Sequence, residues 1–223
     1  MDAVIKVGGS LAENPAALKK LCKKLWEIGE QYRVTVVPGG GVFADVVRAM
    51  DKRFALAADT AHRMALLGMD QYGFLLSEMI PCSCIVYSLD DAAKFSDAKR
   101  VSVFLPSRLI IQEGFLDASW DVTSDSIAAH LAHRLNSAKL ILVTDVDGIF
   151  TLDPKKHSDA EFVKEISAVE LVSLDERTSV DRCLPRLLLE TPMDCFVVNG
   201  RYPQRIKRIM TGQSTVCTRV TAK

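Results

Sequence analysis

The chain is 223 residues long and 48% hydrophobic, so it can bury a substantial core without disulfides or a structural metal. Its 28 Lys and Arg residues balance 28 Asp and Glu residues, which disfavours nucleic acid as a partner. No apolar run reaches the length of a membrane span, and the first residues do not form a signal peptide. We therefore expect a cytoplasmic protein with no membrane partner.

Metal binding by protein side chains alone is not expected. The six cysteines are scattered, mostly within apolar runs, which is typical of reduced thiols that pack as small hydrophobic residues. His130 and His133 lie three residues apart on a predicted helix, but no third ligand is apparent nearby.

Strands and helices alternate at the start of the chain. β-branched runs predict strands at 4–7 and 34–37, and amphipathic patterns predict helices at 15–30 and 42–50. This alternation is typical of a parallel sheet that is covered by helices on both faces.

The rest of the chain continues this α/β pattern as one domain. Residues 55–80 predict two helices, or one bent helix, because Gly68 and Gly73 interrupt them, and the polar residues 90–99 are interpreted as a solvated connection. Further strands are expected at 85–87, 101–105, 140–143, 195–198 and 215–220, and further helices at 124–135, 169–174, 184–189 and after Pro203.

Two glycine-rich loops directly follow the first two predicted strands. The first contains Lys6, Gly8, Gly9 and Ser10, and the second contains Gly39, Gly40 and Gly41. Glycines permit close backbone approach, and bare N–H groups beside a lysine suit a transferring phosphoryl group. A tight turn with a solvated lysine remains an alternative for the first loop, and a hinge for the second.

A third loop of this kind lies within residues 139–154, where a buried type of strand ends in a turn dense in carboxylates and glycine. Open α/β sheets bind ligands at the carboxyl ends of their strands. Neither the Walker pattern nor the dinucleotide fingerprint occurs, so ordinary P-loop and Rossmann sites are disfavoured. The three loops together predict a phosphate-containing ligand.

The two glycine loops, residues 123–125 at a helix start, and residues 144–150 followed by Asp153 and Pro154 resemble the amino acid kinase superfamily over essentially the full chain. The resemblance implies a three-layer αβα sandwich around a mainly parallel sheet of about eight strands. It implies ATP as the donor, Mg²⁺ carried by the nucleotide phosphates, and a homodimer. It further implies an acceptor lobe at about 1–120 and a nucleotide lobe at about 121–223.

The same resemblance implies roles for individual residues. Lys6 would stabilise the transferring phosphoryl group, Asp125 would orient the cations, and the glycine loops with Ser10 would bind phosphate. The nucleotide would contact Thr144, Asp145, Gly148, Phe150, Asp153, Pro154 and Lys155.

The second catalytic cation departs from the family pattern. Members generally supply a second lysine from a Gly-Met-x-x-Lys-like segment, where this chain has residues 179–186. Arg186 is the expected occupant and Arg182 its competitor, and a planar guanidinium is not equivalent to an ammonium. The missing lysine leaves a catalytically silent nucleotide-binding subunit as an alternative.

Residues 56–73 are where acceptors are usually distinguished, and with 179–181 and 198–203 they resemble the methanofuran-pathway subgroup. That subgroup phosphorylates 5-(aminomethyl)-3-furanmethanol phosphate to its diphosphate. Such an acceptor needs a carboxylate for its ammonium and an apolar wall for its furan ring. The expected substrate-binding residues are Asp59, His62, Met64, Asp70 and Gln71, although helix packing also explains His62 and Met64.

Other acceptors remain open, namely isopentenyl phosphate, a nucleoside monophosphate or an amino-acid carboxylate. Isopentenyl phosphate kinases carry a histidine shortly after the glycine triplet, and residues 42–45 of this chain contain none.

Overall fold

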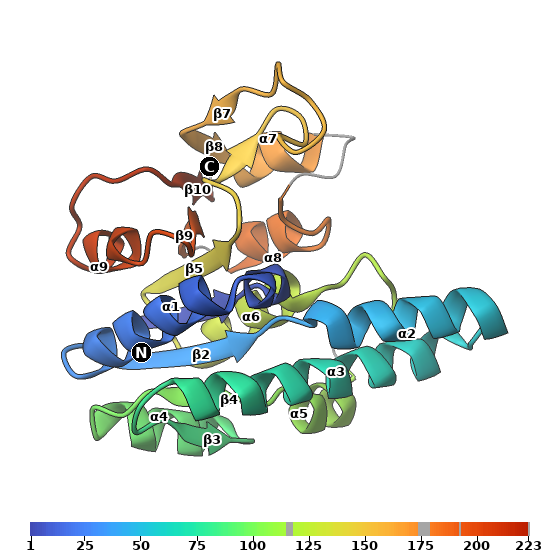
Figure 1. Cartoon of the computed structure of the whole chain (residues 1–223), viewed down its shortest axis with the longest axis horizontal. Coiled ribbons are helices and arrows are strands. Elements are labelled where there is room, and N and C mark those ends of the chain that lie inside the picture. Colours follow the sequence, from blue (N-terminus) through green and yellow to red (C-terminus); the bar gives the residue numbers. More distant parts are fainter. Residues whose placement is uncertain (115–117, 174–178, 192, 223) are drawn as a thin grey trace.

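The computed structural model describes residues 1–114, 118–173, 179–191 and 193–222. An eight-stranded sheet of order β3-β4-β2-β1-β5-β9-β10-β8 runs through its centre (Figure 1). The first six strands in this order are parallel, β10 is antiparallel to β9, and β8 is parallel to β10. The strands are β1 (Ala3–Val7), β2 (Val34–Pro38), β3 (Cys84–Val86), β4 (Ser102–Phe104), β5 (Lys139–Thr144), β8 (Glu165–Ser167), β9 (Asp194–Asn199) and β10 (Thr218–Thr221).

Helices cover both faces of this sheet, as the two hydrophobic clusters show. Alternate residues of β1 face opposite ways, so Ile5 packs in one cluster and Val4 in the other. The Ile5 cluster contains residues of α1 (Pro15–Gly29), α3 (Ala58–Met79) and α9 (Gln204–Met210). The Val4 cluster contains residues of α4 (Leu89–Asp97), α5 (Ser107–Glu113), α6 (Ser124–Arg134), α7 (Ala168–Ser173) and α8 (Leu184–Glu190). The predicted three-layer α/β sandwich with a mainly parallel sheet is confirmed.

The remaining elements directly follow three neighbouring strands, β1, β2 and β5, on the side where these strands end. A 3-10 helix, η1 (Gly9–Glu13), follows β1, and α2 (Gly41–Phe54) follows β2. A two-stranded ribbon of β6 (Ile149–Phe150) and β7 (Phe162–Val163) follows β5. The sequence reading missed this ribbon because its strands are only two residues long.

Of the two alternatives expected for residues 55–80, the structure has a single helix, α3. Its glycine at position 73 permits close packing, since a Cβ there would lie 2.2 Å from Leu105 Cδ2. The expectation for residues 90–99 was wrong. Residues 90–99 are not a solvated connection, since most of them belong to α4. Ser88 caps this helix by accepting a hydrogen bond from Asp91 N at 3.1 Å, and Ala92 is fully buried beneath it.

No helix in the described part of the chain is both long and apolar enough to cross a membrane.

Candidate active site

The predicted strand-end loops meet at one edge of the sheet. β1 lies between β2 and β5, with Lys6 paired in register with Val37 and Leu142. Backbone hydrogen bonds extend the pairing beyond the strands, from Gly8 N to Val143 O and from Gly39 N to Val7 O, each 2.8 Å long. Because parallel strands end together, both glycine loops and the turn after Thr144 face the same space.

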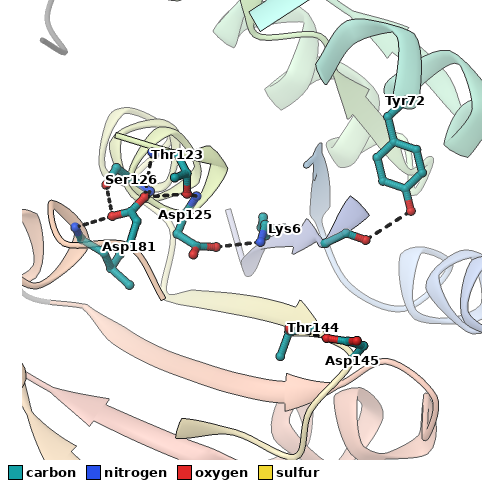
Figure 2. Close-up of polar contacts among 10 residues, drawn as sticks. Lys6, Tyr72, Thr123, Asp125, Ser126, Thr144, Asp145 and Asp181 are labelled. Atoms are coloured by element: carbon teal, nitrogen blue, oxygen red, sulfur yellow. Dashed lines mark hydrogen bonds and ion pairs between the residues drawn. The ribbon is translucent and has the colours of Figure 1, made fainter. Parts of the chain in front are cut away.

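The two glycine loops touch through their backbones. A Cβ on Gly9 would lie 2.1 Å from the Cα of Gly41, and Gly41 itself has φ +53°. Glycine is therefore required at both positions by close approach and by backbone conformation. Tyr72 on α3 supports the first loop by donating a hydrogen bond of 3.3 Å to the carbonyl of Gly8 (Figure 2).

Lys6 and Asp125 form an ion pair at the centre of this edge. Their Nζ and Oδ1 atoms are 2.8 Å apart, and the side chains are 11% and 7% exposed (Figure 2). Burial raises the pKa of Asp125 and outweighs the opposing effect of the Lys6 charge. Apart from Lys6, Oδ1 has no partner among the described residues, so it keeps acceptor capacity that an incoming donor can use.

Three cavities adjoin one another along the edge. A cavity of about 590 Å³ lies beside the glycine loops, a central cavity of about 200 Å³ is lined by Asp125, and a third cavity of about 510 Å³ lies beyond it. We call the first the acceptor-side cavity and the third the nucleotide-side cavity, after the ligands expected in the two lobes. Arg48 and Thr123 line both the first and the second cavity, and Ser179 lines both the second and the third. A donor and an acceptor can thus approach the Lys6–Asp125 pair from opposite sides.

The nucleotide-side cavity gathers most of the residues predicted for that role. Lining residues among them are Thr144, Asp145, Phe150, Asp153, Pro154 and Lys155. The exception is Gly148, which does not line the cavity. Its carbonyl accepts a hydrogen bond of 3.0 Å from Ser179, which does line the cavity, and so helps to hold Ser179 in position. Burial opposes ionisation of Asp145, but the Lys155 ammonium pairs with it and holds its pKa below the ordinary value.

Asp147 fixes the loop that borders this cavity, a role that sequence reasoning missed. Its carboxylate accepts hydrogen bonds from Asn199 Nδ2 at 2.9 Å and from Arg205 at 2.7 Å. The partners come from β9 and α9, and only the folded chain brings them to this loop.

His62 is the predicted substrate-binding residue that lines the acceptor-side cavity, and it does so with Ala65, Leu66 and Met69 of the same helix. These positions are spaced i, i+3, i+4 and i+7, so they share one face of α3. The Nε2 atom of His62 is buried and has no hydrogen-bond partner among the described residues. Burial lowers the pKa of His62, which favours a neutral ring whose Nε2 is available to a ligand.

The other predicted substrate-binding residues lie outside this cavity. Asp59 is exposed and pairs with Arg63 at 2.7 Å, and Gln71 is exposed. Asp70 is buried but faces α5, where it accepts a hydrogen bond of 3.2 Å from Ser107 N. Met64 is half-buried and does not line the cavity.

Charged residues of the acceptor-side cavity were missed by sequence reasoning. Asp45 and Arg48 on α2 line it and pair with each other at 2.9 Å, and Glu13 of η1 lines it too. The Arg48 guanidinium also stacks over Trp120, 4.8 Å from the ring centroid. Helical spacing from the glycine triplet was the available signal, because Gly41, Asp45 and Arg48 follow one another at i, i+4 and i+7.

The two arginines proposed for the second cation occupy different surroundings. Arg182 lines the central cavity together with Asp125. Arg186 lies on α8 and lines none of the three cavities, although both arginines are exposed.

Comparisons with known proteins identify the family of this chain. The sequence model of the amino acid kinase family matches residues 1–184. The chain is 31% identical to a [5-(aminomethyl)furan-3-yl]methyl phosphate kinase of Methanocaldococcus jannaschii, covering 97% of this chain and 96% of that protein. It is 27% identical to a uridylate kinase of Methanococcus maripaludis, covering 95% and 96% of the two chains.

A solved structure shares the fold. The uridylate kinase of Archaeoglobus fulgidus superposes with a TM-score of 0.79 at 23% identity, covering 99% of this chain and 100% of the other. The chain therefore belongs to the amino acid kinase family and is a phosphotransferase.

Proposed function

We propose that the protein transfers the γ-phosphoryl group of ATP to [5-(aminomethyl)furan-3-yl]methyl phosphate and produces its diphosphate, a step of methanofuran-type cofactor biosynthesis. The observation that carries this proposal is the row of adjoining cavities with the Lys6–Asp125 pair at its centre. The named relative in Methanocaldococcus jannaschii, similar over nearly its whole length, supports the choice of acceptor.

Direct in-line transfer fits this arrangement. A phosphate oxygen of the acceptor attacks the γ-phosphorus, the bond from the γ-phosphorus to the bridging oxygen breaks, and ADP leaves without a phosphoenzyme. Lys6 neutralises charge on the transferring oxygens, Asp125 orients Lys6, and backbone N–H groups of Gly9 and Gly40 provide fixed dipoles. The N–H group of Gly8, which was expected to share this role, is already bonded to the carbonyl of Val143. The second cation in this proposal is Arg182 or Arg186.

The acceptor-side cavity has the groups that such an acceptor requires. Arg48 and the free Nε2 of His62 would bind its phosphate, and the carboxylate of Asp45 or Glu13 would bind its ammonium group. Leu66, Met69 and Ile127 would form the apolar wall for the furan ring. Each kind of group therefore has a counterpart on the ligand.

The nucleotide would occupy the opposite cavity, with Mg²⁺ bound to its phosphates. The described residues contain no group of three or more His, Cys, Asp or Glu side chains placed to hold a metal ion, and the carboxylates of Asp125 and Asp145 each pair with a lysine. Phosphate oxygens and water would thus supply most of the Mg²⁺ ligands. A cytoplasmic location and a homodimer, with an acceptor lobe at about 1–120 and a nucleotide lobe at about 121–223, complete the proposal.

A nucleoside monophosphate is the second candidate acceptor, because several relatives are uridylate kinases at 23–27% identity. Release of ADP from ATP is measured with the aminomethylfuran phosphate, UMP, isopentenyl phosphate and a panel of amino acids. The proposal expects the aminomethylfuran phosphate to give the highest kcat/KM. Hydroxylamine trapping of an acyl phosphate would instead reveal a carboxylate kinase, and no ADP release with any acceptor would favour a silent subunit.

A further inference from the structure

Asp181 joins the N-termini of two helices through a single carboxylate (Figure 2). On the α6 side, Oδ2 accepts hydrogen bonds from Thr123 N at 2.9 Å, Thr123 Oγ1 at 2.8 Å and Ser126 N at 3.0 Å. On the α8 side, Oδ1 accepts from Cys183 N at 3.1 Å and Leu184 N at 2.8 Å. Ser126 Oγ donates to the same Oδ1 atom.

This carboxylate satisfies backbone N–H groups that both helices would otherwise leave without a partner. The first N–H groups of a helix have no intrahelical acceptor, and negative charge is favourable near them. Because one rigid group accepts from both helices, it also fixes the position of one helix start relative to the other. Ser126 is fully buried, so water cannot readily replace these contacts.

The residues of α6 that donate hydrogen bonds to Asp181 lie on either side of Asp125, which pairs with Lys6. Thr123 and Ser126 both donate to Asp181, and Asp125 lies between them in the first turn of α6. The carboxylate of Asp125 then reaches Lys6 on β1, as Figure 2 shows. On the other side of Asp181, the next residue in the chain is Arg182, which lines the central cavity.

We propose that Asp181 is a positioning residue for phosphoryl transfer. It holds the first turn of α6 against the segment that begins α8, so that the Lys6–Asp125 pair and the side chain of Arg182 face the same central cavity. Asp181 also lines the central cavity, but both of its carboxylate oxygens already accept hydrogen bonds from α6 and from the segment that begins α8, so it acts through Asp125 and not on the substrate. This inference needs only the kinase reaction, not a particular acceptor.

The test uses Asp181→Asn, Asp125→Asn and the double variant. An amide of the same shape puts an NH₂ group against the N–H donors of one helix, so the first turn of α6 loses its fixed position. We expect Asp181→Asn to lower kcat at least about tenfold and to change KM for ATP less than about threefold. In the Asp125→Asn background, the same substitution should change kcat less than about twofold, because residues that act as a unit are not additive.

A kcat for Asp181→Asn within about twofold of the parent overturns the proposal. Equal fold effects of Asp181→Asn in the parent and in the Asp125→Asn background also overturn it, because Asp181 would then act independently. Thermal unfolding is measured for every variant. If Asp181→Asn is unfolded at the assay temperature, Ser126→Ala carries the test: the proposal expects a lower kcat and the same non-additivity with Asp125→Asn, and the absence of either result overturns it.

Ser88→Ala is the matched control, because it removes the cap of α4, far along the chain from this network. It should lower the melting temperature and leave kcat unchanged. If the parent protein does not turn over the aminomethylfuran phosphate, the acceptor assignment fails, and the variants are compared with the acceptor that does release ADP. Loss of the acceptor assignment is thereby distinguished from loss of the positioning role.

Discussion

The two outer cavities are built in different ways. Lining of the nucleotide-side cavity comes almost entirely from residues 144–157, with Ser179 as the remaining contributor. Four separate segments line the acceptor-side cavity, from η1, α2, α3 and the start of α6. The cavity that we propose for the nucleotide is thus formed by one stretch of sequence, whereas the cavity that we propose for the acceptor forms only after the helices have packed.

Their chemistry differs as well. Lys155, Lys156 and His157 stand beside Asp145 and Asp153 on the nucleotide side, a set suited to phosphate and ribose groups. The acceptor side combines an apolar wall with Arg48 and two carboxylates. The first arrangement can serve any reaction that uses the same donor, and the second is where we expect acceptor specificity to be decided.

Lys6→Ala should have the largest effect, because Lys6 pairs with Asp125 beside the central cavity, where we propose that the phosphoryl group is transferred. Removing a charge that stabilises the transferring group should lower kcat by about 10²- to 10³-fold, with smaller changes in KM for either substrate. Steady-state kinetics measure the loss, and circular dichroism verifies the fold. Lys24→Ala, which removes the Lys24–Glu27 pair on α1, is the control and should keep normal turnover. Normal kcat in a folded Lys6→Ala protein would remove Lys6 from the mechanism.

Arg182→Ala should have the second largest effect on kcat, because Arg182 lines the central cavity that lies between the two outer cavities. We expect kcat to fall about tenfold to a hundredfold as a cation near the transferring oxygens is lost. Arg186→Ala is a closely matched comparison, since the same residue type lies four positions later and is equally exposed. Because Arg186 lines none of the three cavities, kcat should fall less than about threefold. The reverse ranking would assign the second cation to Arg186.

The features of the site that depend on backbone conformation, namely the glycine loops and the strand ends, could be predicted from the sequence. Glycines reveal where loops approach one another, and strand ends show where loops gather, so the sequence predicts that Lys6 and both glycine loops share one site. Asp125 joins that prediction only through the resemblance to the amino acid kinase superfamily. The parallel sheet followed from the same alternation of strands and helices. These features are local in sequence, or repeat with a fixed period.

The acceptor residues could not be found in this way. Asp59 and Asp70 lie on the same helix as His62, but at angles that point them towards Arg63 and towards α5. Which face of α3 borders a cavity depends on where α2 and α6 pack, and the sequence of α3 does not contain that information. Residues 179–181 entered the sequence analysis only through the family resemblance. The role of Asp181 could not be predicted from them, because its partners at the start of α6 lie 55 to 58 residues earlier in the chain.

His62→Ala should affect one side only. Loss of the Nε2 contact should raise KM for the acceptor about tenfold and leave KM for ATP unchanged, because a hydrogen bond to a charged group contributes about 1.5–3 kcal/mol. Arg63→Ala is the adjacent control and should change neither constant. An equal rise of both KM values would mean that the two cavities are not independent, and the comparison between them would fail.

Lys155→Ala should have the smallest effect on the kinetic constants. In contrast to His62→Ala, it should change KM for ATP and not KM for the acceptor. Lys155 is 57% exposed, so solvent screens its charge, and we expect KM for ATP to rise about threefold while KM for the acceptor stays the same. Lys164→Ala, which removes an exposed lysine outside the cavity, is the control. A larger change in KM for the acceptor than for ATP would contradict the assignment of the two sides.

The same variant has a consequence for acid stability. With Lys155 present, the pKa of Asp145 lies below its ordinary value of 3.8, so its stabilising contribution is complete above that pH and is lost as the pH falls through the lower, folded-state pKa. Without the ammonium, burial of Asp145 is no longer outweighed, and its folded-state pKa rises. The midpoint of acid unfolding, followed by circular dichroism, should therefore move to higher pH in Lys155→Ala and stay unchanged in Lys164→Ala. An unshifted midpoint in both variants would show that the Asp145–Lys155 pair does not contribute to stability, and Lys155 would then be free to turn fully towards the nucleotide.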